Sequence, residues 1–536
     1  MTTAADPASG AGPAADSVVR RNVATTSDSP SDEDGANAAI NTASSPGGRG
    51  PAKARATYFG PAGKLRPFRL LRGDAANVRR RWLSDWAVLN QQVVASAVYI
   101  FFTNILPGIT FASDLYVLTG KSWGTIEVVF STGLCGVVFA LFSAQPLTIL
   151  GVTGPFSVLA ENIYKLCQTH FHVDFLSVMA WTLIHAGWMQ VVLAVFNAHD
   201  WTMQYVTHFS ADIFSLLNSV IYFHKAGLEL QRARDHVSLA AFLYAVQTTF
   251  RPSSPDRAAF LVPFWTLPVS WVFLSIIPAA IITVLFFFDH EISSIICTVG
   301  RYGTRKPGGF AWDIVLLGLT TLVCGVLGIP PANGLLPQAP LHSESLLYYE
   351  TVETGPQSGD ESPREPAHRV PRTHEQRYSA FFQAALILIF VSPPFQRLLG
   401  LAQTSVLAGL FLFMGYQSLS VNPILERVAN ILTPRSQLPE LPSGVTWLGI
   451  HCYTVTQIVL TAIVFAITLT VAAPAFPLVI IALVPVRLTL MNRIWSRETL
   501  RVVDGWACRP GKPEDQDQDA TSLDLQTTPS DEEKGK

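Results

Sequence analysis

Long apolar segments recur between residues 89 and 490, and short polar or charged stretches separate them. A helix needs about 20 residues to cross the roughly 30 Å hydrocarbon core of a bilayer. With 49% hydrophobic and only 14% charged residues, the chain is too apolar for a soluble protein. Twelve segments have suitable lengths, near residues 89–111, 126–144, 147–166, 175–197, 206–224, 262–288, 312–329, 334–349, 379–399, 402–420, 450–471 and 473–490. We therefore predict an all-α polytopic membrane protein with about 12 spans.

Two of these segments contain helix-breaking residues in their apolar interior. Gly151, Gly154 and Pro155 interrupt "LTILGVTGPFSVLAENIY" (147–164), and "NGLLPQAP" (333–340) is broken in the same way. Extended backbone in the bilayer core leaves amides that cost several kcal/mol each unless they face protein or a water-filled cavity. Both breaks are therefore predicted to line such a space. The alternative is that the glycines and prolines only permit close packing of helices.

A helix that begins after such a break, here called a half-helix, presents free N–H groups and about half a positive elementary charge at its start. We expect half-helix N-termini near Thr153–Phe156 and Pro337–Ala339. Two N-termini that face one point attract an anion or a polyhydroxy acid. The candidate substrate-binding residues are Thr153, Gly154, Gln338 and Ala339, together with Asp289, which is described below.

The two breaks also lie in matching sequence surroundings. The stretch "LCGVVFALFSAQPLTILGVTGP" (134–155) and the stretch "VCGVLGIPPANGLLPQAP" (323–340) both run from a Cys-Gly-Val helix through a proline turn into a second helix start. A weaker sequence similarity relates "ILPGIT" (105–110) to "IIPAAIIT" (276–283). Because the matches occur in the same order, they predict an inverted repeat, as found in many transporters.

Lys and Arg residues flank both ends of the apolar region. "KLRPFRLLRGDAANVRRRW" precedes the first span, and Arg487, Arg493, Arg497 and Arg501 follow the last. This pattern predicts that both termini are cytosolic. Three polar stretches without periodicity are predicted to be disordered: the cytosolic tail 1–66, the cytosolic loop 350–377 and the acidic tail 509–536, which leaves 67–508 as the transmembrane domain.

Few ionisable residues fall within the predicted spans. Asp289 follows "VLFFF" near the end of one span, and an ionisable group there commonly faces a substrate or proton path; the alternative is a solvated, helix-terminal carboxylate. We expect Glu291 to be solvated and Asp114 to be interfacial. His342, four residues after Gln338, is either a second titrating group or a hydrogen-bonded packing residue.

Several longer runs resemble the bicarbonate-transporter (anion exchanger) family, and within it most resemble the borate exporters of fungi and plants. These runs are residues 101–164, "FFFDHEISSIICT" (286–298), "GLLPQAPLHSESL" (334–346), "EQRYSAFFQA" (375–384), "SVLAGLFLFMGYQSLSVNPIL" (405–425) and "PAFPLVIIALVPVRL" (474–488). The resemblance implies seven plus seven inverted helices, with a core domain that holds the substrate and a gate domain that forms a homodimer. It also implies elevator-type movement of the core against the gate.

On this resemblance we assign core spans near 89–197 and 262–349 and gate spans near 206–250 and 379–490. Two features depart from the family pattern. Gln338 stands where the animal anion exchangers place an Arg, and an amide suits hydroxyl groups better than a permanent cation does. The family has two further crossings where this chain has only Ser238–Arg257, of which the apolar part, 238–250, is too short to cross alone. The gate region is therefore expected to be shortened.

Together these features predict a secondary active transporter that exports boron as borate or boric acid, coupled to protons through Asp289 and with His342 as a second candidate. The alternatives are a bicarbonate or other inorganic-anion exchanger, and a non-transporting membrane scaffold. We expect no catalytic residue, no metal and no cofactor, because no nucleotide-binding loop, metal-ligand cluster or close cysteine pair occurs. The expected partners are the lipid bilayer and the small substrate, not nucleic acid. The expected location is the plasma membrane, with the vacuolar membrane as the alternative.

Overall fold

The computed structural model describes residues 65–202, 207–234, 252–254, 257, 259–298, 302–352, 368–399, 404–420, 422–434, 437–438, 441–442, 444–470 and 472–504. All of them belong to one compact unit, 57–536. The predictions made for residues 1–64, 238–250 and 509–536 therefore lie outside the described residues.

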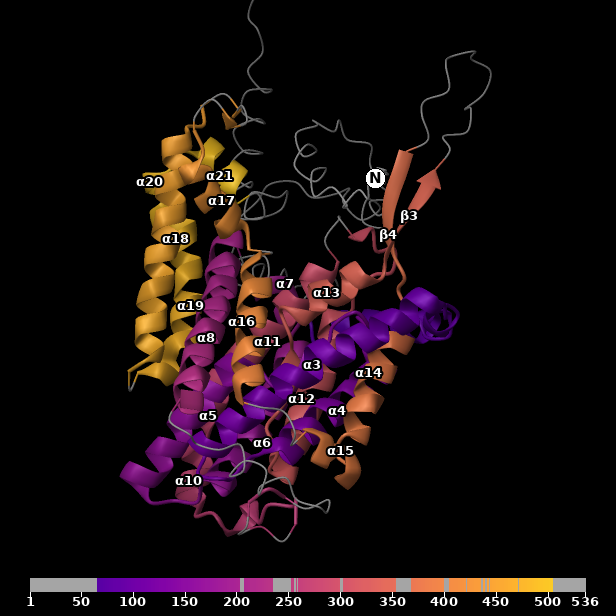
Figure 1. The fold of residues 1–536 in the computed structure, drawn as a ribbon, viewed down its shortest axis with the longest axis vertical. Coiled ribbons are helices and arrows are strands. Elements are labelled where there is room, and N and C mark those ends of the chain that lie inside the picture. Colours follow the sequence, from indigo (N-terminus) through magenta and orange to yellow (C-terminus); the bar gives the residue numbers. More distant parts are fainter. Residues whose placement is uncertain are drawn as a thin grey trace, which may run out of the picture. The chain divides into compact units, whose positions relative to one another are not determined.

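The described residues form a mostly helical membrane protein (Figure 1). Seven helices are long and apolar enough to cross a membrane: α3 (Gln91–Leu118), α4 (Thr125–Phe142), α6 (Phe175–Val195), α10 with α11 (Val269–Leu274 and Ile276–Cys297), α12 (Phe310–Leu327), α18 (Trp447–Thr468) and α19 with α20 (Phe476–Pro485 and Asn492–Ile494). An eighth is formed if α14 (Tyr378–Ile389) and α15 (Pro393–Leu399), bent by 93°, count as one span. The predicted total of about 12 spans is not confirmed and stays a prediction.

The remaining helices are shorter or less apolar. They are α2 (Arg69–Arg81), α5 (Gly154–Leu166), α7 (Ala198–Thr202), α8 (His208–Arg234), α13 (Gln338–Ser345), α16 (Thr404–Ser420), α17 (Pro423–Leu432) and α21 (Arg497–Val503). The helix α13 is only eight residues long, so the segment predicted as a broken span near 334–349 ends early.

The helices pack in two groups. In the first, α12 packs along α6, and α14 packs on α3 and α4. In the second, α8 packs against α16, α18 and α19, which lie beside it in Figure 1. Because α14 packs on α3 and α4, it belongs with the helices that we assigned to the core, although we placed residues 379–490 in the gate.

Close backbone contact joins α6 to α12. A Cβ atom on Gly187 would lie 2.6 Å from the carbonyl oxygen of Gly318, so only glycine fits at this crossing. In lipid, such small-residue contacts let helix backbones approach and gain van der Waals packing. The pairing therefore fixes α12, which leads into the second break, against α6.

A buried arginine joins α14 to the end of α4. The Arg377 guanidinium donates to Asp85 Oδ2 (2.9 Å), to Ala140 O (3.0 Å) and to Ser143 O (2.7 Å), and both charged side chains are fully buried. The last carbonyls of a helix have no partner within it. Arg377 supplies that partner for α4 and so holds the chain that leads into the first break.

Residues 347–373 carry a two-stranded antiparallel sheet. Strand β3 (Leu347–Val352) pairs with β4 (His368–Thr373), with Leu347 opposite Thr373 and Val352 opposite His368. The disorder predicted for 350–377 is therefore wrong at both ends of that stretch, and residues 353–367 lie outside the described part. Glu350 forms ion pairs with Arg305 and Arg372 across the base of the hairpin. The hydropathy pattern of the sequence does not predict these contacts.

Candidate functional site

The two breaks lie side by side and pair with each other. Strand β1 (Leu150–Gly151) runs antiparallel to β2 (Asn333–Gly334), with Leu150 opposite Gly334. The Leu335 amide donates to Ile149 O at 2.8 Å, and Asn104 of α3 donates to Leu150 O at 3.1 Å. The extended backbone therefore finds its hydrogen bonds within the protein, as an apolar environment requires.

Each strand leads directly into a half-helix, as the sequence predicts. Helix α5 begins at Gly154 after the N-cap Thr153, with a proline in its first turn, and α13 begins at Gln338 after Pro337. Thr153, Gly154, Gln338 and Ala339 are all buried. Both helix starts direct N–H groups and the positive ends of their dipoles into the protein interior, an arrangement that favours an anion.

A polar side-chain atom stands without a protein partner at each half-helix start. Gln338 Nε2 donates to Thr103 O at 3.0 Å, but Gln338 Oε1 has no hydrogen-bond partner among the described residues. The same holds for Thr153 Oγ1. Buried polar atoms in folded proteins are nearly always bonded to protein, water or ligand. Two such acceptors at the two helix starts therefore fit a ligand that carries hydroxyl groups.

One cluster of side chains covers both half-helix starts. It consists of Phe111, Tyr222, Ala226, Phe411 and Met414, from α3, α8 and α16. On one side, Phe111 lies 3.4 Å from the position of a Cβ on Gly154. On the other side, Met414 Sδ is 4.0 Å from Gln338 Nε2. The cluster links the two half-helices, and through Tyr222 and Ala226 of α8 and Phe411 and Met414 of α16 it packs their starts against the second helix group.

Asp289 lies beside the second strand. It is buried, and its Oδ2 accepts a hydrogen bond from Asn333 Nδ2 of β2 at 3.1 Å. Helix α11 continues to Cys297, so Asp289 is an interior residue and not, as we expected, one near the end of the span.

Both ring nitrogens of His342 form hydrogen bonds to neighbouring parts of the protein. Its Nδ1 donates to Leu147 O at 2.8 Å, and its Nε2 accepts from Ser379 Oγ at 2.6 Å. Ser379 in turn accepts from Gln376 Nε2. Both ring nitrogens therefore hold α13 to its neighbours, in agreement with the packing alternative for this residue.

Two expectations about charged residues are wrong. Glu291 is fully buried and lies 2.7 Å from His199 Nδ1, although we expected it to be solvated. Asp114 is also buried, and its carboxylate lies 2.5 Å from the ammonium of Lys225 on α8, although we expected an interfacial position. Hydropathy alone does not report a partner that is distant in sequence.

Sequence reasoning did not single out three residues of this site. Asn333 bonds Asp289, Asn104 bonds both Leu150 O and Gln383 Oε1, and Tyr222 closes the site from α8. The signal for the two asparagines was available, because each is an amide in an otherwise apolar run. The position of Tyr222 follows only from the packing of α8.

Comparison with known proteins finds one family. The family model described as "HCO3- transporter integral membrane domain" matches residues 66–242 and 236–507. The two matched segments overlap at residues 236–242, so the match to the family is broken between α8 and α10.

Individual relatives are transporters by name. "Boron transporter 1" of Saccharomyces cerevisiae is 31% identical over 496 residues, which cover 78% of this chain and 82% of that protein. A transporter of Schizosaccharomyces pombe is 29% identical over 490 residues, covering 78% and 92%. "Band 3 anion transport protein" of Rattus norvegicus is 25% identical over 527 residues, covering 82% and 55%.

The strand pairing makes Gly151 sensitive to substitution. A Cβ at this position would lie 2.8 Å from both Asn104 Oδ1 and Leu335 Cδ1. We predict that Gly151→Ala destabilises the protein by about 1–3 kcal/mol, as overpacking of a core does, and lowers the thermal unfolding temperature in detergent. Gly409→Ala is the control, because nothing lies within 4 Å of its Cβ position. Equal unfolding temperatures for the two variants would contradict the importance of the close approach at β1.

Proposed function

The chain belongs to the family of the HCO3- transporter integral membrane domain, and from this membership we propose that it is a secondary transporter that exports boron, as borate or boric acid, from the cytosol. The printed name of the yeast relative, a boron transporter, supports this substrate. The family consists of transporters, which argues against an enzyme.

The main observation behind the proposal is that the starts of α5 and α13 both contact one cluster of side chains, which includes Phe111 and Met414. Each helix start offers a dipole for negative charge and one buried acceptor, Thr153 Oγ1 or Gln338 Oε1, for a hydroxyl donor. Borate presents both a negative charge and hydroxyl groups, and boric acid presents the hydroxyl groups alone. We assign binding to Thr153, Gly154, Gln338 and Ala339.

The inverted repeat is part of the proposal, and the helix packing supports it. Helix α4, which precedes the first break, packs on α14; helix α12, which precedes the second break, packs on α6. The cysteines of the two Cys-Gly-Val sequences meet, with Cys135 Sγ and Cys324 Sγ 3.6 Å apart. Equivalent elements thus make equivalent contacts around the antiparallel β1–β2 pair.

Transport is proposed to proceed by elevator-type movement between the two helix groups. We assign the half-helices to the group of α3, α4, α6, α12 and α14, because both contact α3; α5 also contacts α8 and residues 473–475 of the other group, which consists of α8, α16, α18 and α19. Movement of the first group along the second carries the site across the membrane. The second group is the proposed surface for a homodimer, with both termini in the cytosol of a plasma-membrane protein.

Proton coupling is proposed at Asp289 alone. In its charged form the carboxylate accepts the Asn333 amide, whereas a protonated carboxyl group carries a donor of its own. Because Asn333 lies in β2, a change of charge at Asp289 acts directly on the strand that leads into α13. We do not assign His342 to proton coupling, because both of its ring nitrogens form hydrogen bonds within the protein, to Leu147 O and to Ser379 Oγ.

Two other functions have support from particular observations. An inorganic-anion exchanger is favoured by the similarity to a band 3 anion transport protein. A non-transporting scaffold is favoured by the broken family match at residues 236–242, where the chain is expected to lack part of the gate.

The boron content of cells tests the main proposal. In a strain without its own boron exporter, grown with external boric acid, expression of this chain is expected to lower the cellular boron content several-fold relative to an empty vector. A second variant replaces residues 238–257 by the longer equivalent segment of the yeast boron transporter. If this variant lowers the cellular boron content and the original chain does not, the result would support the non-transporting scaffold instead.

Gln338→Arg tests the assignment of substrate to the second half-helix. A permanent cation here replaces an acceptor of hydroxyl hydrogen bonds, so borate export is expected to fall about tenfold, the cost of one lost contact to a charged ligand. Exchange of chloride or bicarbonate is expected to rise. The control is Gln168→Arg, an exposed position beyond α5. Unchanged borate export in a folded Gln338→Arg protein would contradict the site.

Asp289→Asn tests the proton-linked step. The amide keeps the size of the carboxyl group but cannot exchange a proton, so boron export from proteoliposomes is expected to become independent of an imposed proton gradient. Glu344→Gln, an exposed carboxylate on α13, serves as the control and is expected to retain the dependence. A gradient-dependent Asp289→Asn protein would exclude Asp289 as the coupling group.

A further inference from the structure

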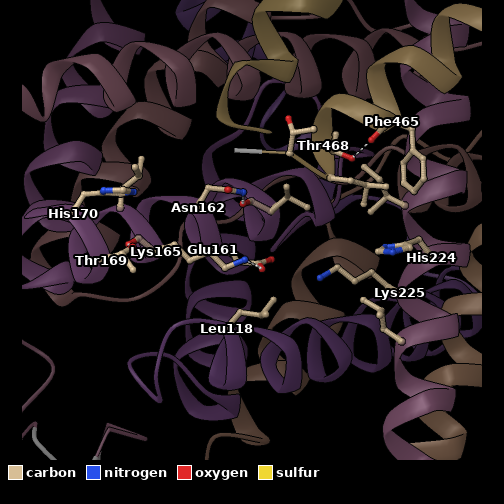
Figure 2. A pocket seen from close by; sticks show the side chains of 16 residues that line it. Leu118, Glu161, Asn162, Lys165, Thr169, His170, His224, Lys225, Phe465 and Thr468 are labelled. Carbon is tan, nitrogen blue, oxygen red and sulfur yellow. Dashed lines mark hydrogen bonds and ion pairs between the residues drawn. The ribbon is translucent and has the colours of Figure 1, made fainter. Parts of the chain in front are cut away.

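The lysines that line the interior cavity each have a carboxylate partner. This cavity of about 430 Å³ lies beside α5 and α8, and Lys165 and Lys225 form part of its wall (Figure 2). Lys165 Nζ lies 2.7 Å from Glu161 Oε1, and Lys225 Nζ lies 2.5 Å from Asp114 Oδ2. The charges at this cavity are therefore balanced within the protein, in contrast to those on one face of α2.

Helix α2 has one exposed face, and that face is basic. Arg72, Ala76, Arg79 and Arg80 follow the i, i+4, i+7, i+8 spacing of a single helix face, and all four are exposed. Within the described residues, none of the three arginines forms an ion pair. The only carboxylate of the helix, Asp74, lies on the opposite face. The exposed face therefore carries three positive charges that the described protein does not balance.

The opposite face of α2 is bonded to the ends of three spans. Asp74 Oδ2 accepts a hydrogen bond from the Ala311 amide at 3.0 Å, which gives a partner to one of the free N–H groups at the start of α12. Directly after α2, Trp82 Nε1 donates to Leu141 O near the end of α4 at 2.8 Å. The residue before α2 donates its amide to the last residue of α6, also at 2.8 Å. Helix α2 therefore lies at the level where these spans leave the membrane.

Side chains around α2 are typical of a membrane interface. The indole of Trp312 donates to Phe142 O at 2.7 Å, at the same level as the indole of Trp82. Leu83, which follows Trp82, is 77% exposed. Trp is enriched where a membrane meets water, and a helix with basic and apolar exposed side chains lies within that interface. The surroundings of the basic face are therefore lipid head groups.

The charge and the residue type both match a phosphate group. Because both termini are predicted to be cytosolic, α2 lies at the cytosolic leaflet, where anionic phospholipids give the surface a negative potential. A guanidinium group has parallel N–H donors that bind two oxygens of one phosphate. Arg72 and Arg79 are about 10 Å apart along the helix axis, at 1.5 Å per residue. They therefore reach different head groups.

We propose that the exposed face of α2 binds the head groups of anionic phospholipids in the cytosolic leaflet through Arg72, Arg79 and Arg80. The other face of the same helix carries Asp74, which bonds the start of α12. Lipid bound to α2 therefore stabilises the start of the helix that leads into the second break. This inference goes beyond the proposed function, because it concerns the lipid partner and does not depend on the transported substrate.

The test uses the full-length protein in nanodiscs made of phosphatidylcholine with increasing fractions of phosphatidylserine. The first readout is the thermal unfolding temperature, which a ligand of the folded state raises. Wild type is expected to gain several degrees with phosphatidylserine and to lose much of this gain in sodium chloride, because salt screens exposed charges. The second readout is native mass spectrometry, in which wild type is expected to retain phosphatidylserine in preference to phosphatidylcholine.

Two variants assign the effect to the arginines. Arg72→Gln/Arg79→Gln/Arg80→Gln changes exposed positions only, so its unfolding temperature in phosphatidylcholine alone is expected to equal that of wild type. Its half-maximal response is expected to need about tenfold more phosphatidylserine or to be absent, since each arginine near an anionic surface contributes about fivefold. Arg72→Lys/Arg79→Lys/Arg80→Lys keeps the charge and is expected to retain most of the response.

A control variant removes the same charge from elsewhere. Lys121→Gln/Arg369→Gln/Arg397→Gln changes three exposed positions outside α2 and is expected to respond as wild type does. A loss of response in this control as large as in the glutamine variant of α2 would overturn the inference, because net charge would then be sufficient.

Equal phosphatidylserine responses in wild type and the glutamine variant would also overturn the inference. If the glutamine variant is already less stable in phosphatidylcholine alone, the lipid retained in native mass spectrometry decides, because it is counted on the folded protein. Boron export is not measured in this test. Failure of the proposed transport function therefore leaves the lipid site standing, and failure of the lipid site leaves the proposed function standing.

Discussion

Hydrogen bonding of extended backbone in an apolar environment is the constraint on which the rest of this structure depends. Two segments leave the helical conformation in the middle of the membrane region, and each supplies the other with partners through the β1–β2 pair. Since lipid offers no hydrogen bonds, neither break is stable alone. Their mutual satisfaction brings the starts of α5 and α13 to one place, which is where we propose the substrate site.

Buried charges are arranged by a similar rule. Each of the carboxylates Asp85, Asp114, Glu291 and Asp504 lies against a basic side chain from a distant part of the sequence or another element. Pairs within the first helix group, such as Asp85 with Arg377, fasten helix ends. The Asp114 and Lys225 pair differs, because it joins the two groups beside a cavity. Buried ion pairs thus both fasten helix ends within one group and join the two groups to each other.

The two half-helix starts and the place where the two family matches meet lie in different parts of the chain. The residues around both breaks lie within the matched segments, and the two segments overlap at residues 236–242, between α8 and α10. The elements that hold the site, from β1 and β2 to Arg377, pack within the first helix group, and Tyr222 of α8 and Met414 of α16 cover the site from the second.

The sequence by itself determined the helical membrane class, the family and the starts of both half-helices, because hydropathy, glycine and proline act over a few residues. It did not determine the pairing of Leu150 with Gly334, the hairpin within 347–373, the packing of α14, or the burial of Asp114 and Glu291. Those features are contacts between residues far apart in the chain. Whether a charge is solvated or paired, and whether a break is exposed or satisfied, is decided by the group that folding brings beside it, and only the tertiary structure provides that group.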